Sequence, residues 1–172
     1  HLLPPVSAAR MSDLPSRLRE ALTVADFTYD AVAELLGPRA AAALERNETT
    51  PGLRRTADGS PLATLVRLFL LQVRVSAEDA QRALPSLVEA LVDQGVLARN
   101  GGMVAARLDC RPYSADGLDL WVVSDLTPGL DGAVNRVAAD HVLGISSAST
   151  SLAHLTLRHP VGVVGAIVPW NF

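Results

Sequence analysis

The sequence predicts a mainly α-helical fold with a small β component, an α+β fold, and three observations predict it. Apolar residues recur at helical spacing from Leu14 to Leu44. Apolar helices with recognisable end signals are expected between residues 61 and 95. Short strand-like segments separated by turn residues then follow up to residue 125. Hydrophobic residues make up 49% of the 172 residues, which is enough to bury a core.

Residues 11–46 are expected to form two or three small helices packed together. Leu14 and Leu18 begin one apolar stripe, and Phe27 begins the next. Gly37-Pro38 ends one helix and starts another, because glycine is favoured just after a helix and proline in its first turn. The following stretch NETTPGLRRTADGS, residues 47–60, is rich in polar and turn-forming residues and is expected to be a linker.

Three further helices are expected at residues 61–72, 76–84 and 85–95. Ser60 is a candidate N-cap for the first and Ser76 for the second, whose first turn carries Glu78 and Asp79 where the helix dipole favours carboxylates. Gly95 stands at the C-terminal end of the third.

A β-hairpin is expected next, from the segments VLA and MVAARLDC around the turn RNGG. RPYSADG is expected to turn into a third strand, LDLWVVSD, in which Trp121 has a packing role. Three helices followed by a hairpin, with LVDQGVL at the join, resemble a winged helix-turn-helix.

The charge of the third helix bears on nucleic-acid binding. Its segment carries Glu89 and Asp93 but no arginine, whereas a helix that reads DNA should offer hydrogen-bond donors to bases and phosphates. DNA binding is therefore disfavoured, and a docking role suits this charge pattern better. Arginines near the hairpin and beside the second helix remain weak candidates for phosphate contact, against solvated surface positions: Arg99, Arg107, Arg111, Arg74 and Arg82.

Composition excludes several classes of protein. The net charge is −3, so nothing draws the chain as a whole toward nucleic acid or an anionic membrane. All 15 basic residues are arginine. Cys110 is the single cysteine, which excludes an intrachain disulfide framework and a multi-cysteine metal site, and it is expected to be a small buried hydrophobe. With no transmembrane stretch expected, a cytoplasmic location is the default.

Most of the chain, residues 11–158, resembles the N-terminal region of actinobacterial class I S-adenosylmethionine-dependent methyltransferases. The resemblance lies in the order of LREALTVADFTYDAVAELLG, the winged-helix block, DLWVVSDLTPGLDG and DHVLGISSASTSLAHLTLR. It implies a parent enzyme that uses S-adenosylmethionine and a methyl-acceptor macromolecule, a protein or an RNA. The family's glycine-rich cofactor loop and its Asn-Pro-Pro-Tyr-like motif have no counterpart in this sequence. We therefore expect a substrate-recognition region that binds no cofactor and is inactive alone.

The last residues carry a different resemblance. PVGVVGAIVPWNF is similar to the strand of NAD(P)-dependent aldehyde dehydrogenases that leads to their oxyanion-hole asparagine. Asn171 matches that asparagine, whose amide would donate a hydrogen bond to the developing oxyanion. The alternative is a plain buried strand with Trp170 in a core. Cys110 lies upstream, in the wing, and does not correspond to that family's nucleophile. An aldehyde dehydrogenase fragment is therefore the third hypothesis, after the methyltransferase recognition region and a winged-helix DNA-binding regulator.

Other polar residues offer no strong catalytic or metal-binding pattern. Asp140-His141, His154 and His159 lack metal-ligand spacing, and solvated or capping roles are expected for them. Six segments are thus expected: an upstream extension (1–10) before Met11, a helical segment (11–46), a linker (47–60), a winged-helix domain (61–125), a lead-in to a catalytic domain missing from the chain (126–158) and a strand-like tail (159–172).

Overall fold

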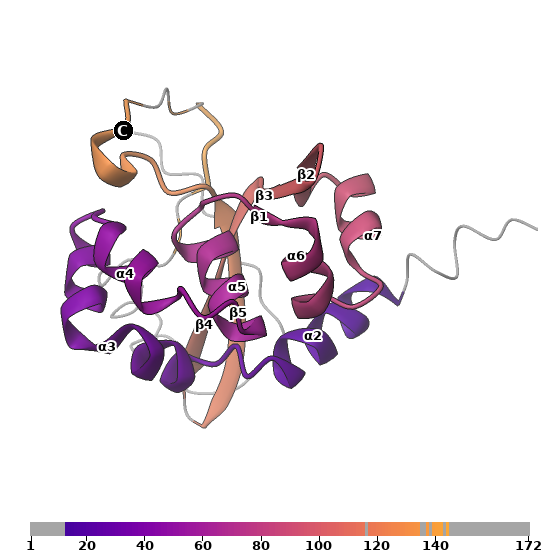
Figure 1. The fold of residues 1–172 in the computed structure, drawn as a ribbon, viewed down its shortest axis with the longest axis horizontal. Coiled ribbons are helices and arrows are strands. Elements are labelled where there is room, and N and C mark those ends of the chain that lie inside the picture. The colour runs from indigo at the N-terminus through magenta and orange to yellow at the C-terminus, as the bar shows by residue number, and fades with distance from the viewer. Residues whose placement is uncertain (1–12, 116, 135–136, 138, 143, 145–172) are drawn as a thin grey trace, which may run out of the picture.

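The computed structural model describes residues 13–115, 117–134, 137, 139–142 and 144, and it confirms the predicted α+β fold (Figure 1). The helical elements are α2 (Leu14–Val24), α3 (Tyr29–Glu45), α4 (Thr50–Arg55), α5 (Pro61–Leu65), the π-helix η1 (Val66–Leu70), α6 (Ala77–Ala83), α7 (Val88–Asp93) and the 3-10 turn η2 (Leu130–Gly132). The strands are β1 (Val75–Ser76), β2 (Leu97–Asn100), β3 (Met103–Ala106), β4 (Leu108–Ala115) and β5 (Leu118–Asp125).

The predicted caps at Ser60 and Ser76 and the break at Gly37 are confirmed, but the helix predicted at residues 85–95 begins only at Val88, because Ser86 has a φ of +59°. The Ser60 hydroxyl accepts a hydrogen bond from the amide of Ala63, and the Ser76 hydroxyl accepts one from the amide of Asp79 at 3.0 Å. Gly37 interrupts α3 with a φ of +68°, in the left-handed region that favours glycine. The break leaves the carbonyl groups of the preceding turn without helical partners. The Arg55 guanidinium donates a hydrogen bond to one of them, the Leu35 carbonyl, at 2.8 Å.

The predicted linker at 47–60 is wrong in its centre, because Thr50–Arg55 forms α4. Both ends of this short helix are held by remote residues. The Asp131 carboxylate accepts from the amide of Thr49 at 2.8 Å and from its hydroxyl, at the end where the helix dipole favours a negative charge. The hydrogen bond from the Thr49 hydroxyl, followed by the one from its amide, lowers the pKa of Asp131. Gly52 is buried, and a Cβ there would lie 2.8 Å from a methyl group of Leu71.

The predicted strands need two corrections. MVAARLDC is not one strand, because it divides at Arg107 between β3 and β4. RPYSADG is not a turn, since residues 111–115 belong to β4, and Cys110 lies in β4 rather than in the wing. Proline usually argues against a strand, but β4 and β5 form a sheet of their own, in which each strand has an open edge that tolerates Pro112.

The helices and the hairpin follow one another in the order predicted for a winged helix-turn-helix. The two-residue strand β1, which the sequence did not predict, pairs with β3 and gives the sheet order β1-β3-β2. The hairpin is short, and the amide of Ala77 at the start of α6 donates to the Gly102 carbonyl in its turn at 2.8 Å. The tip of the wing is therefore pinned to the helices.

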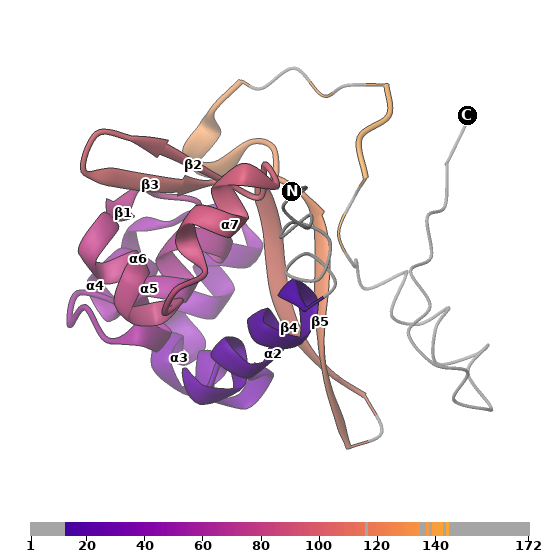
Figure 2. The same ribbon diagram turned by 90° about the vertical axis from the view of Figure 1, so that its right-hand side faces the viewer.

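One apolar core joins the N-terminal helices to the helices and hairpin of residues 61–106. Phe27, which is fully buried, lies 6.3 Å from Phe69 between ring centroids. The β4–β5 ribbon stands beside the helices in Figure 2, and the Trp121 indole N–H donates to the carbonyl of Phe27 at 2.8 Å. The packing role predicted for Trp121 is confirmed. No helix in the described part of the chain has the length and apolar character needed to cross a membrane.

Candidate functional site

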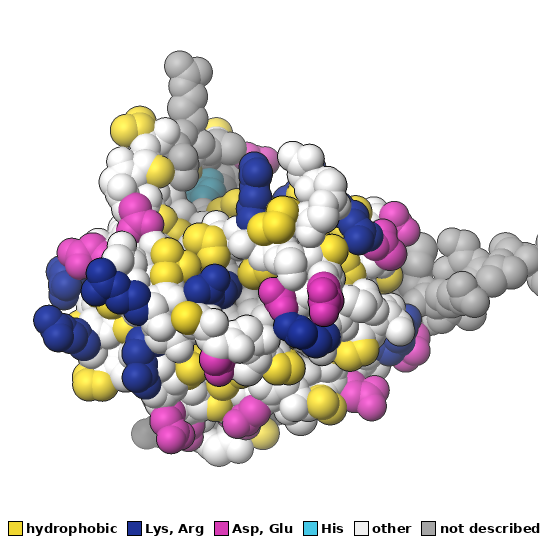
Figure 3. All heavy atoms as spheres, in the orientation of Figure 1, with side chains coloured by type: hydrophobic (Ala, Val, Ile, Leu, Met, Phe, Trp, Pro, Cys, Tyr) yellow, Lys and Arg dark blue, Asp and Glu magenta, His cyan; other side chains and the backbone are white. Residues whose placement is uncertain are grey.

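An excess of arginine lies between residue 39, in the second half of α3, and residue 74, although the first half of α3 carries Asp30 and Glu34 and although Arg46 is paired with Glu48. Figure 3 shows dark blue side chains along the edge formed by α3 and α4. The sequence from 39 to 74 contains six arginines against three carboxylates, although the whole chain has a net charge of −3. They are Arg39, Arg46, Arg54, Arg55, Arg67 and Arg74, against Glu45, Glu48 and Asp58.

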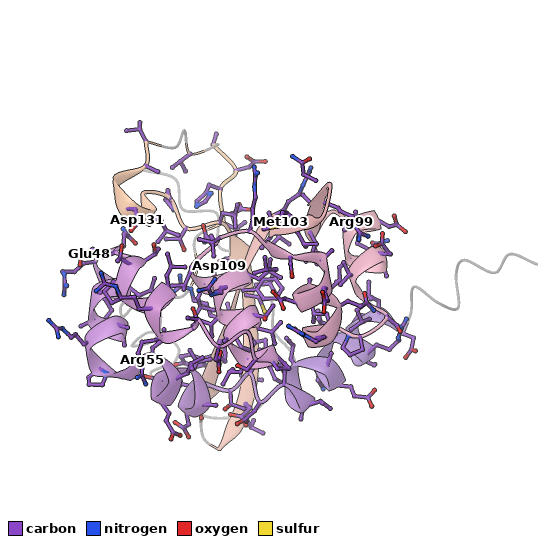
Figure 4. The ribbon with its side chains drawn as sticks, in the orientation of Figure 1. Glu48, Arg55, Arg99, Met103, Asp109 and Asp131 are labelled. Atoms are coloured by element: carbon purple, nitrogen blue, oxygen red, sulfur yellow. The ribbon has the colours of Figure 1, made fainter. Side chains whose placement is uncertain are left out.

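The three arginines proposed from the wing do not converge on one site. Arg99, on β2, forms an ion pair with Glu89 of α7. Arg107 is exposed between β3 and β4, and its amide donates to the Val96 carbonyl at 2.9 Å. Arg111 lies on β4 and donates to the Asp109 carboxylate at 2.9–3.0 Å. Figure 4 shows Arg99 at the hairpin and Asp109 near the centre of the fold.

Asp109 organises a buried polar network. It is 1% exposed, and its carboxylate accepts hydrogen bonds from Arg111, from the Thr127 hydroxyl at 3.0 Å and from the Gln72 amide at 3.3 Å. Gln72 has a φ of +54° directly after the π-helix, a strained conformation that this network holds in place. The Arg111 side chain is 40% exposed, but its hydrogen bonds to Asp109 and Thr127 hold it against the fold, so we assign the network to stability.

A polar hollow on the α4 side is the strongest candidate binding site. It has a volume of about 220 Å³ and lies between α4, α5, β1 and the start of α6, with Met103 of β3 beside it. Its polar lining comes from two arginines, three hydroxyl residues and one carboxylate: Arg67, Arg74, Thr56, Thr64, Ser76 and Asp79.

Arg67 is held rigidly at the hollow. Its Nε donates to the Thr56 carbonyl at 2.8 Å and hydroxyl at 3.0 Å, and its Nη2 donates to the Leu53 carbonyl at 2.9 Å. These bonds cap the C-terminal end of α4, where the helix dipole favours a cation. Its Nη1 donates to no described residue, so two N–H groups of a fixed guanidinium are free for a ligand.

The other polar residues of the hollow favour an anion. Arg74 is exposed and forms no ion pair with a described carboxylate. The Thr64 side chain is buried, while the Ser76 hydroxyl accepts one bond as a helix cap and keeps its own hydrogen for donation. Among the described residues that line the hollow, Asp79 has the only carboxylate, and it forms an ion pair with Arg82.

Two guanidinium groups and nearby hydroxyl donors in a concave surface are suited to a phosphate group. The sequence pointed to Arg74, which stands just before the second helix of the winged-helix block. It did not point to Arg67, whose apolar neighbours in PLATLVRLFLLQ indicate only a buried helix. The excess of arginine between residues 39 and 74 was the signal that could have found this side.

Cys110 is buried as predicted, at 5% exposure. Burial, together with the charge of Asp109, raises the pKa of its thiol to about 12. Because the thiolate is the reactive form, native Cys110 is expected to react with iodoacetamide at pH 8 roughly a thousandfold more slowly than in the denatured chain. Mass spectrometry of native and guanidinium-denatured protein measures both rates, and comparable rates would contradict the burial.

His141, the histidine within the part of the chain that the structure describes, lies beside a carboxylate of the fold. His141 Nδ1 lies 3.6 Å from the Asp125 carboxylate, which also accepts from the amide of Val142 at 2.7 Å. Asp140 is exposed. Among the residues that the structure describes, no three His, Cys, Asp or Glu side chains are grouped to hold a metal ion. His154, His159 and Asn171 lie outside the described residues.

The hollow lies within the part of the chain that is similar to a known domain. The family described as "Domain of unknown function (DUF7059)" matches residues 24–107, from the end of α2 to just past β3. No curated protein and no solved structure matches the chain. The matched region is similar to that domain, and it contains every residue that lines the hollow.

Proposed function

We propose that this chain contains the substrate-recognition region of an S-adenosylmethionine-dependent methyltransferase and does not transfer methyl groups alone. The resemblance of residues 11–158 supports the parent class. The observation that carries the recognition role is the polar hollow, in which the fixed guanidinium of Arg67 and the hydroxyl of Ser76 can hold a group of the acceptor.

The described residues do not fit S-adenosylmethionine. Nucleotide-like cofactors bind where a parallel strand runs through a glycine-rich turn into a helix, so that amides at the helix start face the ligand. The described strands pair antiparallel, and the turns at Gly101-Gly102 and Gly117 connect antiparallel strands. No methyl-transfer step is therefore assigned to these residues.

Two features make a DNA-binding regulator the weaker alternative. The exposed positions of α7 and its end include Glu89 and Asp93, and Arg99 is neutralised by Glu89. The wing, whose tip is bonded to Ala77, is not free to enter a groove. Both elements that a winged helix uses to read a duplex are thus poorly suited to it.

The proposal is tested with the purified chain, tritiated S-adenosylmethionine and an extract of the source organism. The chain alone is expected to label no acceptor and to show no binding of S-adenosylmethionine by calorimetry. In excess, it should sequester its acceptor and lower the labelling of one species severalfold, while an unrelated protein of equal net charge should not.

Three outcomes would contradict the proposal. Methylation by the chain alone would refute its inactivity, and unchanged labelling of every acceptor would refute its recognition role. Tight binding to duplex DNA, with an affinity that falls steeply with salt, would establish the regulator instead. Binding of NAD would favour the aldehyde dehydrogenase interpretation of the tail, for which Asn171 is the proposed oxyanion donor.

A further inference from the structure

We propose that the polar hollow binds a backbone phosphate of an RNA acceptor. This inference rests on the proposed function and specifies its substrate class. The resemblance leaves a protein or an RNA as the acceptor, and the chemistry of the hollow distinguishes between them.

The first step is the match between the hollow and one phosphate group. The two free N–H groups on Arg67 Nη1 belong to a guanidinium that is already immobilised by three hydrogen bonds. Little conformational entropy is then lost when a ligand binds, which favours affinity. Arg74 adds a second, exposed cation, and the Ser76 hydroxyl adds a neutral donor to the same hollow of about 220 Å³.

The second step is the extent of the positive surface. From the hollow, exposed arginines continue over α4, where Arg54 is exposed, to the edge in Figure 3 where basic side chains lie among a few acidic ones, such as Glu48, which is paired with Arg46. A single anion would not need charge over this distance, whereas a polynucleotide carries a phosphate on every residue. The acidic remainder of the chain confines such a ligand to this side.

The third step concerns the form of the nucleic acid. Arg67 is only partly exposed and lines a concave site, so the phosphate must enter the hollow to reach it. A flexible single strand can place one phosphate there, and its other phosphates can follow the arginines of α3 and α4. The elements that would read a duplex, α7 and the wing, are acidic or pinned.

The test is the anisotropy of a fluorescent single-stranded RNA of about 12 nucleotides, titrated with the full chain over a series of salt concentrations. Arg74→Glu is expected to weaken binding about tenfold and to lower the salt slope by about one phosphate contact or more. Arg19→Glu on α2 is the matched control, since it makes the same charge change at an exposed position away from the hollow. It should change the affinity less than about twofold.

Arg74 is the chosen site because its exposed side chain makes no hydrogen bond or ion pair with a described residue, whereas replacing Arg67 would uncap α4. Circular dichroism and thermal unfolding of both variants check that the fold is intact. Equal affinities of the two variants, or no binding of RNA by the native chain, would overturn the inference.

The labelling experiment separates this inference from the proposed function. If the species whose methylation the chain suppresses is destroyed by ribonuclease, the inference is supported. If that species is destroyed by protease and resists ribonuclease, the recognition role stands and the RNA assignment is overturned. If no species is suppressed, the proposed function itself fails.

Discussion

Replacing Asp109 with alanine is expected to lower the free energy of unfolding by about 1.5–3 kcal/mol, because it removes a buried carboxylate that accepts hydrogen bonds from three side chains, one of them the half-exposed guanidinium of Arg111. The side chain of Asp109 is 2% exposed and accepts hydrogen bonds from Arg111, Thr127 and Gln72. Its removal leaves the Arg111 guanidinium without its partner and leaves two neutral donors unsatisfied. The strained backbone at Gln72 also loses the bond that holds it.

Urea denaturation followed by circular dichroism measures the loss. Asp119→Ala on β5 is the control, since that carboxylate is exposed and its removal should change stability by no more than about 0.5 kcal/mol. A loss for Asp109→Ala that matches the control would mean that the network contributes nothing to folding.

Replacing Phe27 with alanine is expected to destabilise the protein by about 3–5 kcal/mol. Phe27 is fully buried against Phe69, so the change leaves a cavity at the junction of the N-terminal helices and the winged-helix block. Because the core is shared, the whole described part should lose stability together rather than the N-terminal helices alone.

The measurement is denaturation followed by two probes, circular dichroism for the helices and tryptophan fluorescence, in a chain with Trp170→Phe so that Trp121 is the only tryptophan. The two transitions should coincide and shift together. Val24→Ala is the control, because that side chain is 81% exposed and lies three positions earlier. If the helical signal were lost first while the fluorescence transition stayed in place, the N-terminal helices would form a separate unit.

The sequence predicted the helix ends well because they depend on local chemistry. Ser60 and Ser76 cap the helices that follow them, and Gly37 and Gly95 adopt the left-handed conformation that favours glycine. The mixed fold class follows from the same local signals. The charge of α7 was also readable, since Glu89 and Asp93 need no tertiary information.

The missed elements depend on partners far along the chain. Helix α4 is fixed by Asp131 at one end and Arg67 at the other, and neither contact leaves a pattern in NETTPGLRRTADGS. Strand β1 is too short to show alternation and exists only by pairing with β3. The site was missed for the same reason, because the fold alone places Arg67 and Arg74 on one hollow.

The bond between the Trp121 indole and the Phe27 carbonyl joins residues 94 positions apart, and this separation governs how the nascent chain matures. At about 5–20 residues per second, roughly 5–20 seconds of translation separate the appearance of the two partners. During that interval the first helices have emerged from the ribosome while the β-ribbon that completes their packing has not been made. The apolar surface around Phe27 is then open to chaperones, so the packing of these helices is completed only after the β-ribbon has been synthesised.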